Sequence, residues 1–190
     1  MGSVISIISR KGGSGKTTTA IHLATLYAQR DYAVSVLDFD NDGSALAWQR
    51  RSERLPFEVF PASKTEAAMR LSERKNGVVI IDTPPNNAQA LGAAARASSR
   101  VVVVSRANAL EEDRLAPSIE NLLASGFDGE WGVLITQVRS RKLGDELAGN
   151  IATAGFKVLG QIPYRVEYER AFGYEPTRLV DYEIALGGWL

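Results

Sequence analysis

The chain has 190 residues, 45% of them hydrophobic, which is enough for one domain with a sizeable core. Lysine plus arginine and aspartate plus glutamate number 22 each, so the balanced charge gives no overall sign of a nucleic-acid partner, and any such surface must be local. Because the chain has no cysteine, disulfides, zinc–thiolate sites and iron–sulfur clusters are excluded.

Short apolar runs alternate with amphipathic stretches along the sequence. The runs predict strands at residues 4–9, 33–38, 57–60 (the weakest), 78–82, 101–105, 131–136 and 158–162. The stretches predict helices at 17–29, 44–51, 64–74, 89–97, 111–124, 143–154 and 167–172. This alternation favours an α/β fold, a doubly wound, mostly parallel sheet with helices on both faces. With no repeat or linker evident, we expect a single domain over residues 1–190.

The first predicted strand leads through a glycine-rich turn into a helix. Residues 10–18 read Arg-Lys-Gly-Gly-Ser-Gly-Lys-Thr-Thr, directly after the apolar run 4–8. Such a turn aims backbone N–H groups and the positive end of the helix dipole at one point, which suits a di- or triphosphate. In a phosphate-binding loop, Lys16 reaches the β- and γ-phosphates and the Thr17 hydroxyl ligates Mg²⁺. The expected nucleotide-binding residues of this segment are Lys11, Gly12, Gly13, Ser14, Gly15, Lys16, Thr17 and Thr18.

The loop departs from the usual pattern at its start, where Arg10 stands in place of a glycine. Lys11 supplies a second cation, so two lysines bracket the glycines. This arrangement resembles the deviant loop of the ParA/MinD group of P-loop ATPases, and in particular short ParA-type partition ATPases without an N-terminal helix-turn-helix. The resemblance implies ATP and Mg²⁺ as cofactors, and a homodimer on ATP in which Lys11 reaches the nucleotide of the opposite subunit.

An acidic segment, Asp38-Phe39-Asp40-Asn41-Asp42, ends the second predicted strand. It resembles the family motif whose second aspartate orients the attacking water, which implies this role for Asp40. The family commonly continues with Pro-Gln, and Asn41-Asp42 departs from that. On their residue types alone, Asp42 and Ser44 are better interpreted as a turn and a helix N-cap.

Four branched apolar residues at 78–81 precede Asp82 and the sequence Thr-Pro-Pro. A carboxylate at the end of such a strand is suited to holding Mg²⁺ through a bound water, because Mg²⁺ keeps much of its hydration shell. We therefore expect a metal site formed by Thr17 and Asp82. The expected catalytic residues are Lys11, Lys16 and Asp40.

The last two predicted strands fall where the family approaches the adenine ring. The resemblance implies base contacts from Thr136 and Pro163, and many family members have Asn at the position of Thr136. His22, the sole histidine, lies inside the first predicted helix and is interpreted as a helix-face residue rather than a catalytic base.

ParA proteins of the short type bind DNA nonspecifically as ATP dimers and are released when a centromere- or cargo-bound protein stimulates hydrolysis. The resemblance implies these partners here. The candidate DNA contacts are Arg139, Arg141, Lys142, Arg165, Arg170 and Arg178. Each residue alone is better interpreted as a solvated charge, because nonspecific binding depends on how many cations share one face.

The predicted function is an Mg²⁺-dependent ATPase that partitions or positions a plasmid, chromosome region or protein cargo. With no signal peptide and no apolar stretch of membrane-spanning length, we expect a cytoplasmic, nucleoid-associated protein. One alternative is a MinD-like membrane-associated ATPase, but residues 180–190 are acidic and contain Gly187-Gly188, so Trp189 and Leu190 are interpreted as a packed tail. The other is a metabolic P-loop enzyme, for which no second cluster of polar residues is evident.

Overall fold

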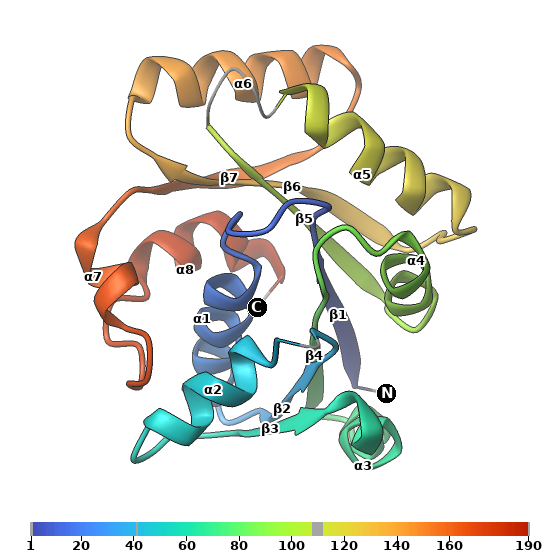
Figure 1. The fold of residues 1–190 in the computed structure, drawn as a ribbon, viewed down its shortest axis with the longest axis vertical. Coiled ribbons are helices and arrows are strands. Elements are labelled where there is room, and N and C mark those ends of the chain that lie inside the picture. The colour runs from blue at the N-terminus through green and yellow to red at the C-terminus, as the bar shows by residue number, and fades with distance from the viewer. Residues whose placement is uncertain (1, 41, 108–111, 190) are drawn as a thin grey trace.

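The computed structural model describes residues 2–40, 42–107 and 112–189, and the side chains of residues 112–114 are not described. The predictions that fall on Asn41, Glu111 and Leu190 therefore lie outside the described residues. A seven-stranded sheet in the order β3-β2-β4-β1-β5-β6-β7 forms the centre, and every strand pair is parallel (Figure 1). The strands are β1 (Ser3–Ile8), β2 (Ala33–Asp38), β3 (Glu58–Pro61), β4 (Gly77–Asp82), β5 (Arg100–Arg106), β6 (Glu130–Val138) and β7 (Val158–Pro163).

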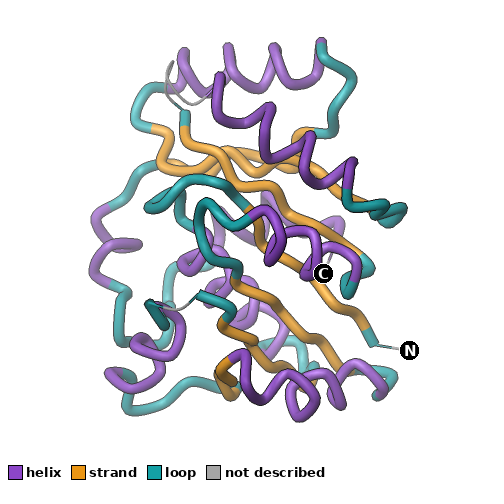
Figure 2. Tube along the Cα trace, turned by 45° about the vertical axis from the view of Figure 1, so that its right-hand side comes forward, coloured by secondary structure: helices purple, strands orange, loops and turns teal. Residues whose placement is uncertain are grey.

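Helices cover both faces of the sheet (Figure 2), which confirms the predicted doubly wound α/β fold. They are α1 (Lys16–Ala28), α2 (Ser44–Arg51), α3 (Thr65–Met69), α4 (Ala88–Arg96), α5 (Glu112–Ala124), α6 (Arg141–Thr153), α7 (Val166–Arg170) and α8 (Val180–Leu186). Successive residues of β1 show the division, because Ile5 and Ile7 pack with α1, α2, α7 and α8, whereas Val4 and Ile8 face the clusters formed with α3 to α6. The central strands are continuous apolar runs because both of their faces are buried.

Two predicted helices are shorter than expected. The prediction at 64–74 is wrong in part, because α3 covers only Thr65–Met69 and is flanked by 3₁₀ turns at Ala62–Lys64 and Arg70–Glu73. The chain tightens there because it must enter β4 at once, where Gly77 lies so close to the Leu71 carbonyl that no side chain fits. The helix predicted at 167–172 ends at Arg170, before a turn at Gly173 with φ +86°.

The C-terminal segment contains α8, a helix that the sequence did not predict. Tyr182, Ala185 and Leu186 lie three and four residues apart and are buried against α1 and β7. This helix is short, and its outer side exposes Val180 and Ile184 beside Glu183, so its apolar residues give no clear helical pattern over a longer window. No described helix combines the length and apolar character that a membrane crossing requires.

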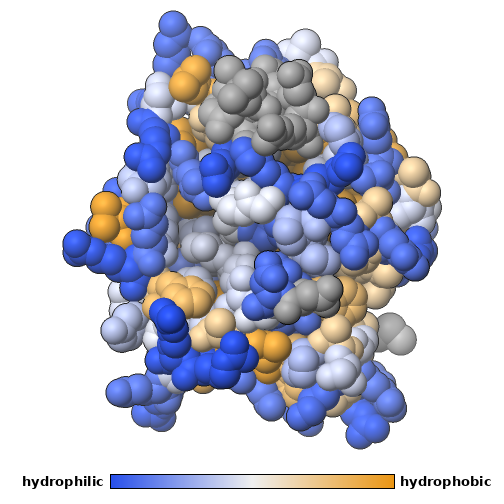
Figure 3. Space-filling model, in the orientation of Figure 1, coloured by the Kyte–Doolittle hydropathy of each residue, from blue (hydrophilic) through white to orange (hydrophobic). Residues whose placement is uncertain are grey.

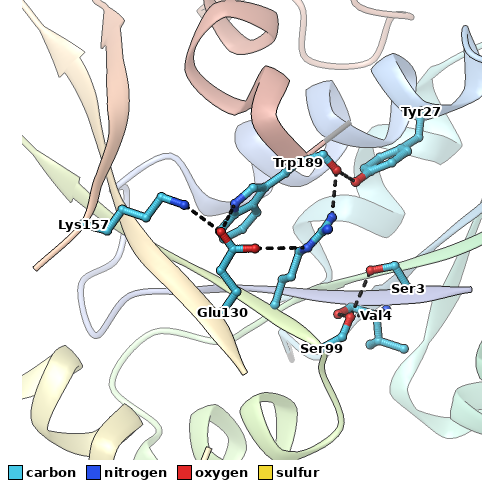
Figure 4. Close-up of polar contacts among 8 residues, drawn as sticks. Ser3, Val4, Tyr27, Ser99, Glu130, Lys157 and Trp189 are labelled. Carbon is cyan, nitrogen blue, oxygen red and sulfur yellow. Dashed lines mark hydrogen bonds and ion pairs between the residues drawn. The ribbon is translucent and has the colours of Figure 1, made fainter. Parts of the chain in front are cut away.

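Beyond α8 the chain docks at the amino ends of β5 and β6, the end of the sheet opposite the glycine-rich loop (Figure 4). The Trp189 carbonyl accepts hydrogen bonds from the Tyr27 hydroxyl and from Arg100 (2.9 Å). The indole N–H of Trp189 donates to Glu130 (3.0 Å), and Glu130 also pairs with Lys157 (2.6 Å). Trp189 is therefore part of a packed tail, as predicted.

Candidate nucleotide-binding site

The glycine-rich loop joins β1 to α1 at the carboxyl end of the sheet. Gly13 and Gly15 have φ angles of +70° and +93°, a region that other residues rarely adopt. Gly15 is the N-cap of α1 and offers no capping side chain, and the first turn of this helix has no acidic residue. The N-terminus of α1 therefore presents its backbone N–H groups and its positive dipole end with no capping side chain and no acidic residue of its own first turn.

An open pocket of about 370 Å³ lies over this loop. Hydrophilic residues predominate on the face that carries it (Figure 3). The pocket brings together six of the eight predicted loop residues, all but Lys11 and Ser14, with Asp40 and an aromatic edge from Trp48 and Phe172. Its lining comprises Gly12, Gly13, Gly15, Lys16, Thr17, Thr18, Asp40, Asp42, Ser44, Trp48, Pro85, Gln137 and Phe172.

Lys16 is a buried cation at the base of the pocket, with 6% of its surface exposed. Its Nζ donates to the Lys11 carbonyl at 3.0 Å, and the Ser14 hydroxyl donates to the same oxygen at 3.2 Å. Burial lowers the pKa of Lys16, and the nearby carboxylates of Asp82 and Asp40 oppose that effect. Lys16 thus lies within electrostatic reach of both predicted acidic residues.

Thr17 and Asp82 meet as the metal prediction requires. The Thr17 hydroxyl donates to Asp82 Oδ2 at 2.6 Å, while Asp82 Oδ1 is buried without a hydrogen-bond partner in the described part of the chain. Burial raises the pKa of Asp82 to about 7, against the opposing hydrogen bond from Thr17. An unpartnered carboxylate oxygen beside a hydroxyl fits a divalent cation that draws its other ligands from phosphate and water. Among the described residues, no group of three or more His, Cys, Asp or Glu side chains gathers to hold a metal by itself.

The two aspartates at the end of β2 have different surroundings. Asp38 accepts backbone hydrogen bonds from Asp40 (3.0 Å) and Leu46 (2.9 Å), so it orders the turn into α2. Asp40 lines the pocket and accepts from the Asp42 N–H at 3.1 Å, consistent with a turn. The N-cap prediction for Ser44 is wrong, because Gly43 occupies that position with φ +63° and Ser44 is the first helical residue.

Thr136 and Pro163 line a second, smaller pocket of about 110 Å³ beside the loop. The Thr136 hydroxyl lies within hydrogen-bonding distance of the Ser14 carbonyl (2.7 Å) and the Ser105 carbonyl (3.2 Å). This side chain therefore tethers the loop to the sheet, a contact that the sequence did not predict. Its contact with a base, like that of Pro163, stays a prediction.

His22 lies on the buried face of α1, with 1% of its surface exposed. Its Nδ1 is 2.7 Å from the Thr18 carbonyl, and its ring stacks on Tyr182 with centroids 4.7 Å apart. Burial lowers its pKa to about 4. The residue is a neutral member of the core, in agreement with its interpretation as a helix-face residue.

The candidate DNA-contacting residues fall into two groups. Arg141 and Lys142 begin α6 and form exposed pairs with Asp145 (3.5 Å) and Glu146 (3.8 Å), while the Arg139 guanidinium lies 3.4 Å from the centre of the Tyr164 ring. The second group is centred on α7 and α8. Arg165 and Arg178 both pair with Asp181, at 2.8 and 3.3 Å, and Arg170 is an exposed residue at the end of α7.

Two residues at this site were missed by the sequence analysis. Arg106 at the end of β5 and Gln137 near the end of β6 both bond the Gly13 carbonyl. Polar residues at strand ends were a usable signal for Arg106. The sequence around Gln137 did not indicate a contact with the loop. Its side chain reaches the loop because its backbone is left-handed (φ +53°), at an irregularity of the β6–β7 pairing.

The parallel sheet with its glycine loop, lysine and threonine defines a P-loop nucleotide-binding domain. The model of the CobQ/CobB/MinD/ParA nucleotide binding domain matches residues 5–176, and the chain belongs to this family.

Among curated relatives, the chain is 34% identical over 148 residues to the maintenance of carboxysome distribution protein A of Gloeobacter kilaueensis. That match covers 75% of this chain and 66% of the relative, so the chain spans about two thirds of its length. Among solved structures, the fold is similar to a plasmid partition protein of Borrelia burgdorferi bound to AMPPNP, with TM-score 0.81, 18% identity and coverage of 100% and 98%. The fold is also similar to that of apo McdA from Cyanothece, with TM-score 0.79 and 18% identity; the match covers 99% of this chain and 98% of McdA.

Proposed function

We propose that this chain is a single-domain, Mg²⁺-dependent ATPase that acts as a nucleotide-controlled positioning switch. The observation that carries the proposal is that Lys16, Thr17 and Asp40 line one pocket at the N-terminus of α1, with the buried Asp82 bonded to Thr17 behind it. A cation, a hydroxyl–carboxylate pair and backbone amides are the groups that a nucleoside triphosphate with Mg²⁺ requires. The AMPPNP ligand of the Borrelia partition protein supports the same use of this fold.

Each residue has a distinct part in hydrolysis. Lys16 and the loop amides hold the β- and γ-phosphates, and Asp40 orients a water for in-line attack on the γ-phosphorus. Thr17 and Asp82 hold the metal, which when bound neutralises charge on the phosphate oxygens. Thr136 and Pro163 lie beside the base. Because catalysis rests on positioning rather than on a covalent intermediate, small movements of the loop control the rate.

Lys11 is the residue that makes this ATPase a switch. It lies at the start of the loop and is not among the residues that line the pocket. We assign it to the nucleotide of the opposite subunit in an ATP-bridged homodimer, where it acts like an arginine finger in trans. ATP then stabilises the dimer and hydrolysis releases it.

The surface on which the switch acts is proposed to be DNA. The relatives named for plasmid partition and carboxysome distribution support a positioning role, with a centromere- or cargo-binding protein that stimulates hydrolysis in a nucleoid-associated dimer. We assign the first DNA contacts to Arg139, Arg141 and Lys142, because the exposed pairs of the last two are weak and easily exchanged for phosphates. Arg170 and the Asp181-paired Arg165 and Arg178 are the second group.

DNA is favoured over a membrane surface by the placement of α8. Tyr182 and Leu186 on this helix are buried in the core, together with Trp189 beyond it. A membrane-binding role requires a broad apolar face of a helix to be available to lipid. In α8, Tyr182, Ala185 and Leu186 are packed against α1 and β7, which leaves only Val180 and Ile184 as exposed large apolar side chains of this helix.

The test is binding of a labelled, sequence-unrelated DNA duplex without nucleotide, with ADP and with ATP plus Mg²⁺, at two salt concentrations. The proposal predicts salt-sensitive binding only with ATP, and none for Lys16→Ala. Replacing Arg141 and Lys142 by Ala should reduce the salt dependence by about one phosphate contact per residue. ATP hydrolysis without DNA binding in any state would contradict the DNA assignment and favour a membrane or metabolic ATPase.

A further inference from the structure

Three hydrogen bonds converge on one carbonyl oxygen of the nucleotide loop. Arg106 donates to the Gly13 carbonyl from Nε (2.9 Å) and from a terminal nitrogen (2.7 Å), and Gln137 Nε2 donates to the same oxygen at 2.9 Å. Both side chains come from the sheet rather than from the loop. We propose that Arg106, assisted by Gln137, is a positioning residue that fixes the orientation of the loop amides toward the nucleotide phosphates.

The planarity of the peptide bond explains how a hydrogen bond to a carbonyl group can orient an amide N–H group. A trans peptide is planar, and its C=O and N–H groups point in opposite directions. When the Gly13 carbonyl is held toward Arg106, the N–H of Ser14 points the other way. The next peptide is held in the same manner, since the Ser14 carbonyl is 2.7 Å from the Thr136 hydroxyl and the N–H of Gly15 points away from it. The sheet therefore orients two successive amides of the loop.

The fold itself positions the two side chains, Arg106 and Gln137, that bond the Gly13 carbonyl. Arg106 is opposite Thr136 in the register of β5 and β6, so the residues that hold the two carbonyls are neighbours on adjacent strands. Gln137 adopts its left-handed backbone at this place, which costs energy unless a contact compensates. A Cβ on Gly13 would lie 2.8 Å from Arg106, so the loop backbone and the guanidinium are closely packed.

Arg106 acts on the loop rather than on the nucleotide. Gln137 and the loop glycines line the main pocket, whereas Arg106 is not part of the lining of either pocket beside the loop. The guanidinium is permanently charged, and it polarises the Gly13 peptide so that the Ser14 N–H becomes a stronger donor. The loop amides of this motif cradle phosphates shared by ADP and ATP. Arg106 should therefore influence both nucleotides, whereas a group that touches only the γ-phosphate would influence ATP alone.

The binding test, which rests on the proposed function, compares Arg106→Ala and Arg106→Lys with Arg96→Ala, which removes an exposed arginine at the end of α4. We expect Arg106→Ala to weaken MgADP and MgATP binding alike, each by about tenfold, since a charge-assisted hydrogen bond is lost. Arg106→Lys should recover part of the loss, and Arg96→Ala should bind like the wild type. Unchanged affinity for both nucleotides, or an effect on ATP alone, would overturn the proposal.

A second measurement separates this inference from the proposed function. In the nucleotide-free protein, NMR reports the Gly13 carbonyl carbon and the Ser14 amide directly. Both signals should move to lower chemical shift in Arg106→Ala and only partly in Arg106→Lys, with the thermal unfolding midpoint retained. If the wild type binds no nucleotide, the proposed function fails while this readout still tests the contact. Signals that stay in place would show that Arg106 does not hold the loop.

Discussion

His22 is the sole histidine of the chain, and its burial gives a sharp prediction about stability and pH. The ring is enclosed by Tyr168, Tyr182 and Trp48, with centroids 4.7 to 6.2 Å away, and Nδ1 bonds the Thr18 carbonyl. These neighbours offer no negative charge to stabilise an imidazolium. Burial therefore lowers the pKa of His22 from 6.5 to about 4.

The sign and size of the His22 contribution to folding stability follow from the protons bound in the folded and unfolded states. Between pH 6.5 and about 4, the unfolded chain binds a proton at His22 that the folded chain does not. The stability that neutral His22 contributes is thus present above pH 6.5 and is lost as the pH falls toward 4. The lowering to about 4 corresponds to about 3 kcal/mol at most. Asp82 works in the opposite direction, because its raised pKa adds stability at low pH that is lost as the pH rises through about 7.

The assay compares urea unfolding of the wild type and His22→Asn without nucleotide, at about pH 7.5 and about pH 4.5. Asn keeps an N–H donor near Nδ1 and does not titrate, and the comparison cancels the contribution of Asp82. The wild type should lose about 2 to 3 kcal/mol more than the variant on acidification. Equal losses would refute the reasoning, as would a histidine NMR signal in the folded protein that titrates near its ordinary pKa.

Three further predictions concern the site. Asp40→Ala should retain ATP binding while phosphate release falls by about a hundredfold or more, and normal turnover would remove Asp40 from the mechanism. Lys11→Ala should leave ATP-bound monomers in light scattering, whereas a dimer equal to that of the wild type would exclude its action across the interface. Asp82→Asn should abolish the dependence of ADP affinity on added Mg²⁺, measured by titration calorimetry with and without EDTA, and a dependence that persists would place the metal elsewhere.

The parts of this molecule that the sequence predicts are those set by burial and by local backbone chemistry. Strands buried on both faces read as apolar runs, so β1, β2 and β4 were expected at nearly their observed bounds. Because parallel strands end at one edge of the sheet, Asp40 and Asp82 could be assigned to the same site as the glycine loop.

The remaining features depend on contacts between distant segments. Helix α3 is cut short by the close approach of Gly77 to the Leu71 carbonyl, which no pattern within 64–74 encodes. Arg165 looks in sequence like the exposed Arg141, yet it pairs with Asp181, which lies 16 residues further along the chain. The contact of Gln137 with the loop requires a backbone angle that its sequence neighbours do not signal.

The most direct test of the account is calorimetric titration of ATP with Mg²⁺ into the wild type, Lys16→Ala and Lys142→Ala. Lys142 is an exposed lysine on α6 and serves as the matched loss of one positive charge. The account predicts saturable binding by the wild type and Lys142→Ala, with no detectable binding by Lys16→Ala. Equal affinity in all three proteins would contradict the assignment of the phosphate site to the loop between β1 and α1.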